Sequence, residues 1–119
     1  MAWPVRLAFR AGDRALRASF DDGASFDIPF ELLRVESPSA EVQGHAAHEK
    51  RLVAGKRGVM AVSAEPVGRY AVRIGFDDGH GSGLYSWDYL RTLGENADAM
   101  MAGYAARLEA AGLSRDRDA

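Results

Sequence analysis

The stretch from Tyr70 to Leu93, YAVRIGFDDGHGSGLYSWDYLRTL, constrains the fold most, because a strand, a loop, a second strand and a helix start follow one another without a break. Its apolar residues Tyr70, Val72, Ile74 and Phe76 alternate with Ala, Arg and Gly. This period of two is typical of a half-buried strand. We therefore predict a strand at the centre of the domain, with Tyr70 on its buried face.

The loop DDGHGSG, residues 77–83, begins with a chain-reversal signal and is longer than a simple hairpin requires. An extended run resumes after it. Ser86 is then placed to cap a helix that begins at Trp87, because a serine hydroxyl can accept a hydrogen bond from an amide of the first turn. We expect His80 to hold this long loop by hydrogen bonds from its ring to backbone or to Asp78.

Composition places the chain among ordinary globular domains. It has 119 residues, 47% of them apolar and 27% charged, with a formal net charge of -2. A chain of this length forms one domain, which we expect at residues 1–113, followed by a frayed tail at residues 114–119. The charge balance gives no bias toward nucleic acid. The absence of cysteine excludes disulfides, cysteine catalysis and thiolate-held clusters within the chain.

No targeting or membrane segment is expected. The start, MAWP, lacks a basic region followed by an apolar stretch, and no run approaches the roughly 18 apolar residues that span a bilayer. We therefore expect a cytoplasmic protein.

Periodicity predicts the rest of the architecture. Alternating residues at 5–9, 16–20 and 25–28 predict a three-stranded meander, and a further strand is expected at 59–63. Short helices are expected at 30–34 and 39–43. Gly94 is a suitable end for the helix that begins at Trp87, and Asn96 a suitable cap for a last helix with an apolar stripe. The fold class is thus α+β, a mainly antiparallel sheet covered by short helices and a carboxy-terminal helix.

Several strings of the chain resemble one known domain family. These are GRYAV at 68–72, DDGH at 77–80, GLYSWDYL at 83–90, and LLR at 32–34 followed by SPSAE at 37–41. Together they resemble the gamma-butyrobetaine hydroxylase-like N-terminal domain family. The resemblance implies a fold rather than an activity, since such domains occur alone, at the start of iron- and 2-oxoglutarate-dependent hydroxylases, and on iron–sulfur carriers.

The resemblance implies that the hydroxylases of that family hold a structural zinc with three cysteines and one histidine. His80 matches the histidine, and the cysteine positions fall on Ser37, Ser39 and Val42. Hydroxyls and a valine cannot replace the soft sulfur donors of a structural zinc site. We therefore expect this chain to share the fold of that family but not its zinc ion, and we expect no cofactor.

Two further sites are weighed against simpler interpretations. His45 and His48, together with His80, are an alternative metal-binding set, but unconnected surface histidines are the preferred interpretation. The basic stretch at 45–58 suits an anionic partner, yet it lacks interleaved aromatic residues and is better explained as a solvated loop. We therefore expect no contact with nucleic acid.

The sequence contains no catalytic triad, no iron-binding triad and no cofactor fingerprint, and the aspartates before His80 are explained by turn formation, so we do not expect an enzyme. We interpret the chain as a non-catalytic accessory or protein-interaction domain. The resemblance links its partner to iron–sulfur protein maturation or to an oxygenase-type protein. The alternative is a metal- or small-molecule-binding protein, or an enzyme of unknown reaction, that uses the His80 loop. The expected binding surface comprises Arg34, Asp77, Asp78, His80 and Ser82.

Overall fold

The computed structural model of the chain describes residues 3–43 and 50–116. Within them the fold is α+β, as predicted, and the strands fall into two antiparallel sheets of three strands each. The elements follow in the order β1 (Pro4–Arg10), η1 (Ala11–Asp13, a 3-10 helix), β2 (Ala15–Phe20), β3 (Ser25–Pro29), α1 (Phe30–Val35), α2 (Ala40–Gln43), β4 (Ala61–Val67), β5 (Ala71–Phe76), β6 (Gly83–Ser86), α3 (Trp87–Glu95) and α4 (Ala97–Ala110).

The first sheet is the predicted meander, with strand order β1-β2-β3. Alternation along β2 buries Leu16, Ala18 and Phe20 on one face, because successive side chains of a strand point to opposite sides. The neighbouring strand β3 adds Ile28 to the same face, opposite Leu16. This face forms one wall of the hydrophobic core.

The second sheet has the order β4-β5-β6 and contains the predicted central strand. Val72, Ile74 and Phe76 of β5 are buried, as the alternation indicates. The prediction for Tyr70 is wrong: it precedes β5 in the turn from β4, and 56% of its surface is exposed. Strand β4 also extends further than expected, through Pro66 to Val67, so the turn begins at Gly68 with a φ of 64°.

The helix that follows β6 begins where the sequence predicts. The Ser86 hydroxyl accepts a hydrogen bond from the Tyr89 amide, which caps α3. Gly94, however, lies inside α3 and does not end it. A Cβ at this position would lie 2.7 Å from Phe26 of β3, so glycine permits close contact between helix and sheet. Asn96 occupies the expected cap position before α4, but its side chain does not cap the helix: its amide donates to the Thr92 carbonyl at the end of α3.

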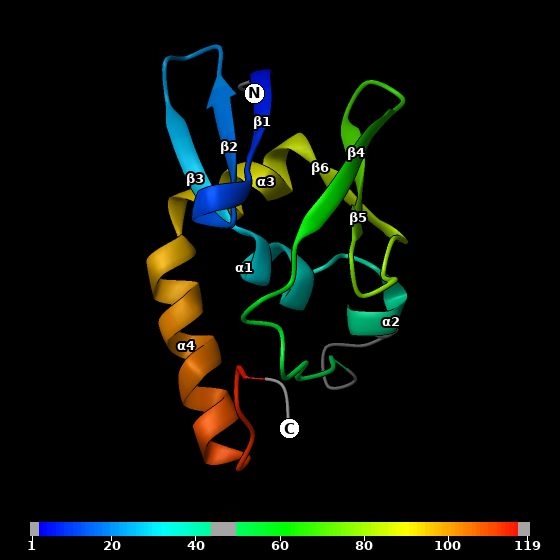
Figure 1. Cartoon of the computed structure of the whole chain (residues 1–119). Coiled ribbons are helices and arrows are strands. Elements are labelled where there is room, and N and C mark those ends of the chain that lie inside the picture. Colours follow the sequence, from blue (N-terminus) through cyan, green and yellow to red (C-terminus); the bar gives the residue numbers. More distant parts are fainter. Residues whose placement is uncertain (1–2, 44–49, 117–119) are drawn as a thin grey trace.

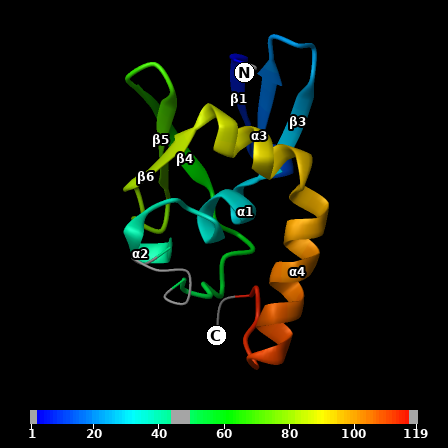
Figure 2. The same cartoon turned by 180° about the vertical axis from the view of Figure 1, so that it is seen from behind.

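Figures 1 and 2 show the two sheets side by side, with α3 crossing behind them in the view of Figure 1. Helix α1 lies between and below the sheets, and α4 extends downward below the first sheet. Phe30, Leu32 and Leu33 of α1 have no exposed surface. The core therefore forms where α1, α3 and the inner faces of both sheets meet.

Part of the tail expected to fray is docked. The backbone carbonyls of Ser114 and Arg115 accept hydrogen bonds from Gly55 and Arg57, at 2.9 Å each. The Arg115 guanidinium also binds both carboxylate oxygens of buried Glu31, at 2.8 and 2.6 Å. Residues 117–119 lie outside the described residues.

Among the described residues, no helix combines the length and the apolar character that a membrane span requires.

Candidate functional site

The His80 loop joins β5 to β6 and is held by its own backbone. The Phe76 amide donates to the His80 carbonyl at 2.8 Å, and the Gly79 amide donates to the Phe76 carbonyl at 3.2 Å. Gly79 has a φ of 90°, which a residue with a Cβ rarely adopts. The loop is thus a closed turn that needs glycine at this position.

The His80 ring is buried and faces the segment that follows α1. Its Nε2 lies 2.9 Å from the Ser37 hydroxyl oxygen, in a buried hydrogen bond. Beside it, the hydroxyls of Ser39 and Ser82 lie 2.8 Å apart. Ser37 is thus a partner of the ring, and Asp78 accepts a hydrogen bond from the His80 backbone amide.

Asp78 joins the loop to two cations. Its Oδ2 lies 2.7 Å from Arg34 Nε and 2.7 Å from Lys56 Nζ, and all three side chains are largely buried. Burial alone would raise the pKa of this carboxyl. The hydrogen bonds from Lys56, from the His80 amide and from Arg34 outweigh that effect and lower the pKa of Asp78 to about 2. The carboxylate is therefore ionised and neutralised at physiological pH.

Asp77, the other aspartate of the loop, binds backbone rather than a cation. Its carboxylate accepts from the Met60 amide at 3.1 Å, and its own amide donates to the Met60 carbonyl at 2.9 Å. The structure thus brings Arg34, Asp78 and His80 together, with Ser82 beside Ser39. A cavity of about 370 Å³ opens beside the two aspartates and is lined by Gly55, Lys56, Gly58, Val59, Asp77 and Asp78.

The residues at the aligned metal positions do not fit a zinc ion. Ser37 and Ser39 offer neutral hydroxyls, and Val42 presents only hydrocarbon to its buried surroundings. The Ser37 hydroxyl is also engaged with the His80 ring. No group of three or more His, Asp or Glu residues suited to a metal occurs within residues 3–43 and 50–116. His45 and His48 of the alternative set lie outside the described residues.

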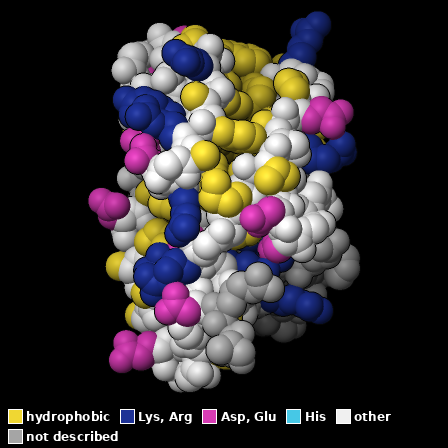
Figure 3. Space-filling model, viewed as in Figure 1, with side chains coloured by type: hydrophobic (Ala, Val, Ile, Leu, Met, Phe, Trp, Pro, Cys, Tyr) yellow, Lys and Arg dark blue, Asp and Glu magenta, His cyan; other side chains and the backbone are white. Residues whose placement is uncertain are grey.

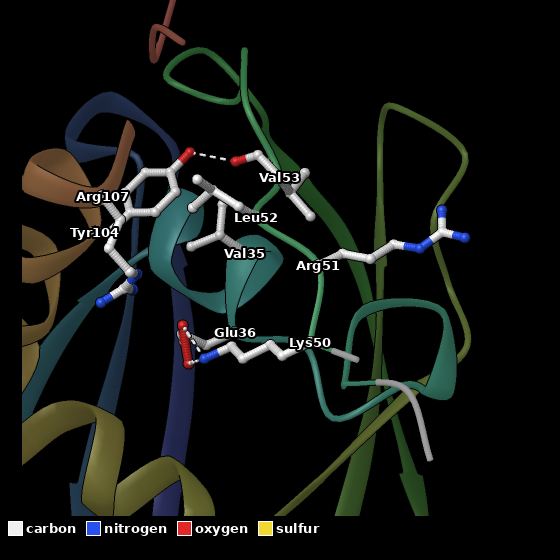
Figure 4. A pocket seen from close by; sticks show the side chains of 8 residues that line it. All are labelled: Val35, Glu36, Lys50, Arg51, Leu52, Val53, Tyr104 and Arg107. Carbon is white, nitrogen blue, oxygen red and sulfur yellow. Dashed lines mark hydrogen bonds and ion pairs between the residues drawn. The ribbon is translucent and has the colours of Figure 1, made fainter. Parts of the chain in front are cut away.

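A second cavity, of about 220 Å³, lies between α1, α4 and the segment before β4. Val35, Leu52 and Val53 form its apolar side, and Tyr104 donates a hydrogen bond to the Val53 carbonyl at 2.5 Å (Figure 4). The Lys50 ammonium closes the opposite side by binding both carboxylate oxygens of Glu36, at 2.5 and 2.8 Å (Figure 4). Since this carboxylate is already neutralised, the cavity offers mainly apolar contact. Its remaining lining residues are Arg51 and Arg107.

Exposed apolar side chains lie on β1 and β4, which are edge strands of their sheets. The register shifts between Pro4 and Arg6 on β1, and between Ala61 and Ser63 on β4. Each shift is a bulge that leaves one residue without a cross-strand partner. That residue is a valine in both strands.

These two valines are the most exposed large apolar side chains of the described chain, Val5 at 66% and Val62 at 60%. Bulges re-aim side chains, and here both valines turn toward solvent. Further exposed aromatic residues lie on the same two strands or beside them. We call this surface the bulge face; it comprises Trp3, Val5, Phe9, Val62 and Tyr70.

The bulge face involves both sheets and reaches the core. The rings of Trp3 and Tyr70 lie 5.4 Å apart and join the sheets at one end. Phe9 contacts the buried Phe30 of α1 edge to face, with ring centroids 5.9 Å apart. Figure 3 shows apolar side chains gathered between the two sheets in the view of Figure 1. Sequence analysis did not identify this face, because nothing in the alternation of β1 or β4 marks a bulge.

Comparison with known proteins places the chain in a family. The family model described as "Gamma-butyrobetaine hydroxylase-like, N-terminal" matches residues 7–91. A protein solved by solution NMR is 44% identical, with a TM-score of 0.86, and the match covers 100% of this chain and 94% of that chain. A second NMR structure is 45% identical, with a TM-score of 0.84 and coverage of 97% and 86%.

A crystal structure from Acidithiobacillus ferrooxidans, of a protein of unknown function from the DUF971 family, is 37% identical. Its TM-score is 0.64, and the match covers 76% of this chain and 90% of that chain. No curated protein matches the chain. The family match and these likenesses show that the chain belongs to the gamma-butyrobetaine hydroxylase-like N-terminal domain family, also called DUF971.

Proposed function

We propose that this protein is a non-catalytic interaction domain that binds another protein through the bulge face. The observation that carries the proposal is the exposure of two valines, one at an edge-strand bulge of each sheet, together with three exposed aromatic side chains on or beside the same strands. Contiguous exposed apolar surface is uncommon on monomeric proteins and marks contact sites. Aromatic residues are also enriched among the residues that contribute most to binding.

The bonding of the loop aspartates supports a binding role over acid-base catalysis. Asp78 is held ionised between Arg34 and Lys56, so it does not carry a proton near neutral pH. Asp77 accepts from the Met60 backbone. Both carboxylates thus stabilise the loop, and we propose that the loop forms a rigid part of the binding domain.

The partner proposed from family membership is an oxygenase-type protein or a protein of iron–sulfur cluster maturation. The family description names the amino-terminal part of a hydroxylase, which supports an oxygenase-type partner for a domain that occurs alone. The iron–sulfur link rests on the appended domains of the resembled family. Any cluster would belong to the partner, since this chain has no cysteine to hold one.

A second candidate function is small-molecule binding beside the His80 loop. The cavity of about 370 Å³ at Asp77 and Asp78 favours it, because its size falls in the range of small-ligand sites. Lys56 and the two aspartates give this cavity polar groups of both charges. Ligand binding there would leave the bulge face uninvolved, so the two candidates are separable.

A capture experiment with matched variants tests the proposed function. Tagged wild-type protein, Val62→Glu and Leu113→Glu are each incubated with extract of the source organism, and bound proteins are identified by mass spectrometry. Leu113 is a suitable control because it is also exposed, at 46%, but follows α4 at the far end of the fold from the bulge face. We expect one protein to bind the wild type and Leu113→Glu but not Val62→Glu. Equal recovery with all three would contradict the proposal.

A further inference from the structure

The bulge face is poorly suited to pairing with an added strand, although both of its strands are sheet edges. Strand addition requires an unbroken row of backbone donors and acceptors. Pro4 begins β1 and Pro66 lies within β4, and proline has no amide hydrogen to donate. The bulges at Val5 and Val62 interrupt both edges as well. These are the devices by which proteins protect sheet edges from pairing.

A partner of this face is therefore recognised by side chains rather than by backbone. The bulges that disrupt the two edges are also the features that expose Val5 and Val62. An apolar stripe along a helix is the common way to cover such a surface without backbone pairing. Strand β1, which carries Val5 and Phe9 of the face, has seven residues and spans about 23 Å at the strand rise. A helix of about 15 residues has this length.

The charged residues at the border of the face indicate which residues flank the apolar stripe of the partner helix. Arg6 follows Val5 on β1, and Arg69 precedes Tyr70 in the turn between β4 and β5. Both are exposed, and neither forms an ion pair within the described part of the chain. Glu65 is the exposed acidic residue of β4. Asp21 also borders the face, where its carboxylate accepts a hydrogen bond from the Trp3 amide, and Glu65 lies opposite Arg73 of β5. The border thus carries charges of both signs, and Arg6 and Arg69 are cations of this border that no ion pair of the described residues neutralises.

From these observations we infer that the bulge face receives an amphipathic helix whose apolar stripe is flanked by acidic residues. This inference rests on the proposed function and specifies its partner. Acidic residues beside the stripe would form ion pairs with Arg6 and Arg69. Such complementary charges steer association and fix the orientation of the bound helix. A second copy of this chain is a poorer occupant, because it would bring a second Arg6 and a second Arg69 to the contact rather than the carboxylates that these two residues lack.

Synthetic peptides of about 15 residues test the inference. The first places Leu at helical spacing with Glu beside the stripe, and the second has the same composition with Leu and Glu alternating as in a strand. The third replaces each Glu of the first by Lys. Binding is followed by NMR of the full chain, through the methyl signals of Val5 and Val62 and the exchange of the β1 amides.

We expect the first peptide to shift both valine signals, and the second and third to bind at least about tenfold more weakly. The double variant Arg6→Glu with Arg69→Glu should prefer the Lys peptide to the Glu peptide. Leu113→Glu should bind all three as the wild type does. Tighter binding of the alternating peptide with slowed exchange in β1 would overturn the inference in favour of strand addition. Self-association of the chain through Val62, or no shift with any peptide, would also overturn it.

The capture experiment separates the two levels of the argument. If Val62→Glu loses its protein partner while no helical peptide binds, the interaction function stands and the helical partner is wrong. If Val62→Glu keeps every partner and no peptide binds, both are wrong.

Discussion

Ser37 and His80 lie 43 residues apart in the sequence and meet in a buried hydrogen bond of 2.9 Å between Oγ and Nε2. The bond joins the segment after α1 to the loop between β5 and β6. Gly83 permits this approach, since a Cβ there would lie 2.4 Å from the Ser37 hydroxyl oxygen. The loop is therefore fixed to the rest of the domain by a buried polar contact.

Removal of either partner should destabilise the fold measurably. We expect Ser37→Ala and His80→Ala each to lower the free energy of unfolding by about 1 to 3 kcal/mol, because the remaining polar group is left buried without this bond. The double variant should cost less than the sum of the two, with a coupling of about 1 kcal/mol. Urea unfolding measures all three values. Strictly additive effects would show that the bond contributes nothing to stability.

Asp78→Asn should cost about 2 to 3 kcal/mol, since it leaves Arg34 and Lys56 close together without their shared carboxylate. An effect of this size arises because all three side chains are largely shielded from water. Asp88→Asn is the matched control, because Asp88 is exposed in the first turn of α3. If both variants lose a similar amount of stability, the proximity of Arg34 and Lys56 is not the cause of the loss.

The lowered pKa of Asp78 predicts that the stability of the fold depends on pH. The pKa of Asp78 falls from its usual 3.8 to about 2 in the fold, so the unfolded chain binds the proton first as pH decreases. Stability contributed by Asp78 is therefore complete above about pH 4 and is lost as pH falls toward 2. The loss amounts to about 1 to 2 kcal/mol after allowance for partial exposure. In Asp78→Asn, stability should decline less between these two pH values, and an unchanged decline would contradict the assignment.

Removal of metal should leave the domain folded. Ser37, Ser39 and Val42 supply no thiolate, and structural zinc contributes directly to folding where it is present. We expect the thermal transition to be the same before and after treatment with a chelator, and elemental analysis to find no stoichiometric zinc. A transition that is lost with chelator and restored by zinc would refute this.

The fold was largely predictable because the buried faces of its strands and helices leave a periodic mark. Val72 and Phe76 are buried as the alternation indicates, whereas Tyr70 continues the same pattern but lies beyond the strand. Gly94 has the composition of a helix end, yet its role depends on Phe26, which is distant in sequence. Periodicity describes one segment and carries no information about the residue that packs against it.

The candidate site was predictable only in part for the same reason. Arg34, Asp78 and His80 were expected together, and the structure places them together. Ser37 was not expected as a partner of the ring, although its alignment with a ligand position of the resembled family was a signal for its proximity. The bulges at Val5 and Val62 had no local signal, because a register shift depends on both strands of a pair.

The most direct test of the bulge face is photo-crosslinking in living cells. A photoreactive phenylalanine replaces Val62 in one variant, Leu113 in a second and Ser82 of the His80 loop in a third. The proposed function predicts a crosslink to one specific protein from position 62 and none from position 113. A crosslink to a specific protein from position 82 or 113 that is missing at position 62 would contradict it, as would three variants that remain uncrosslinked.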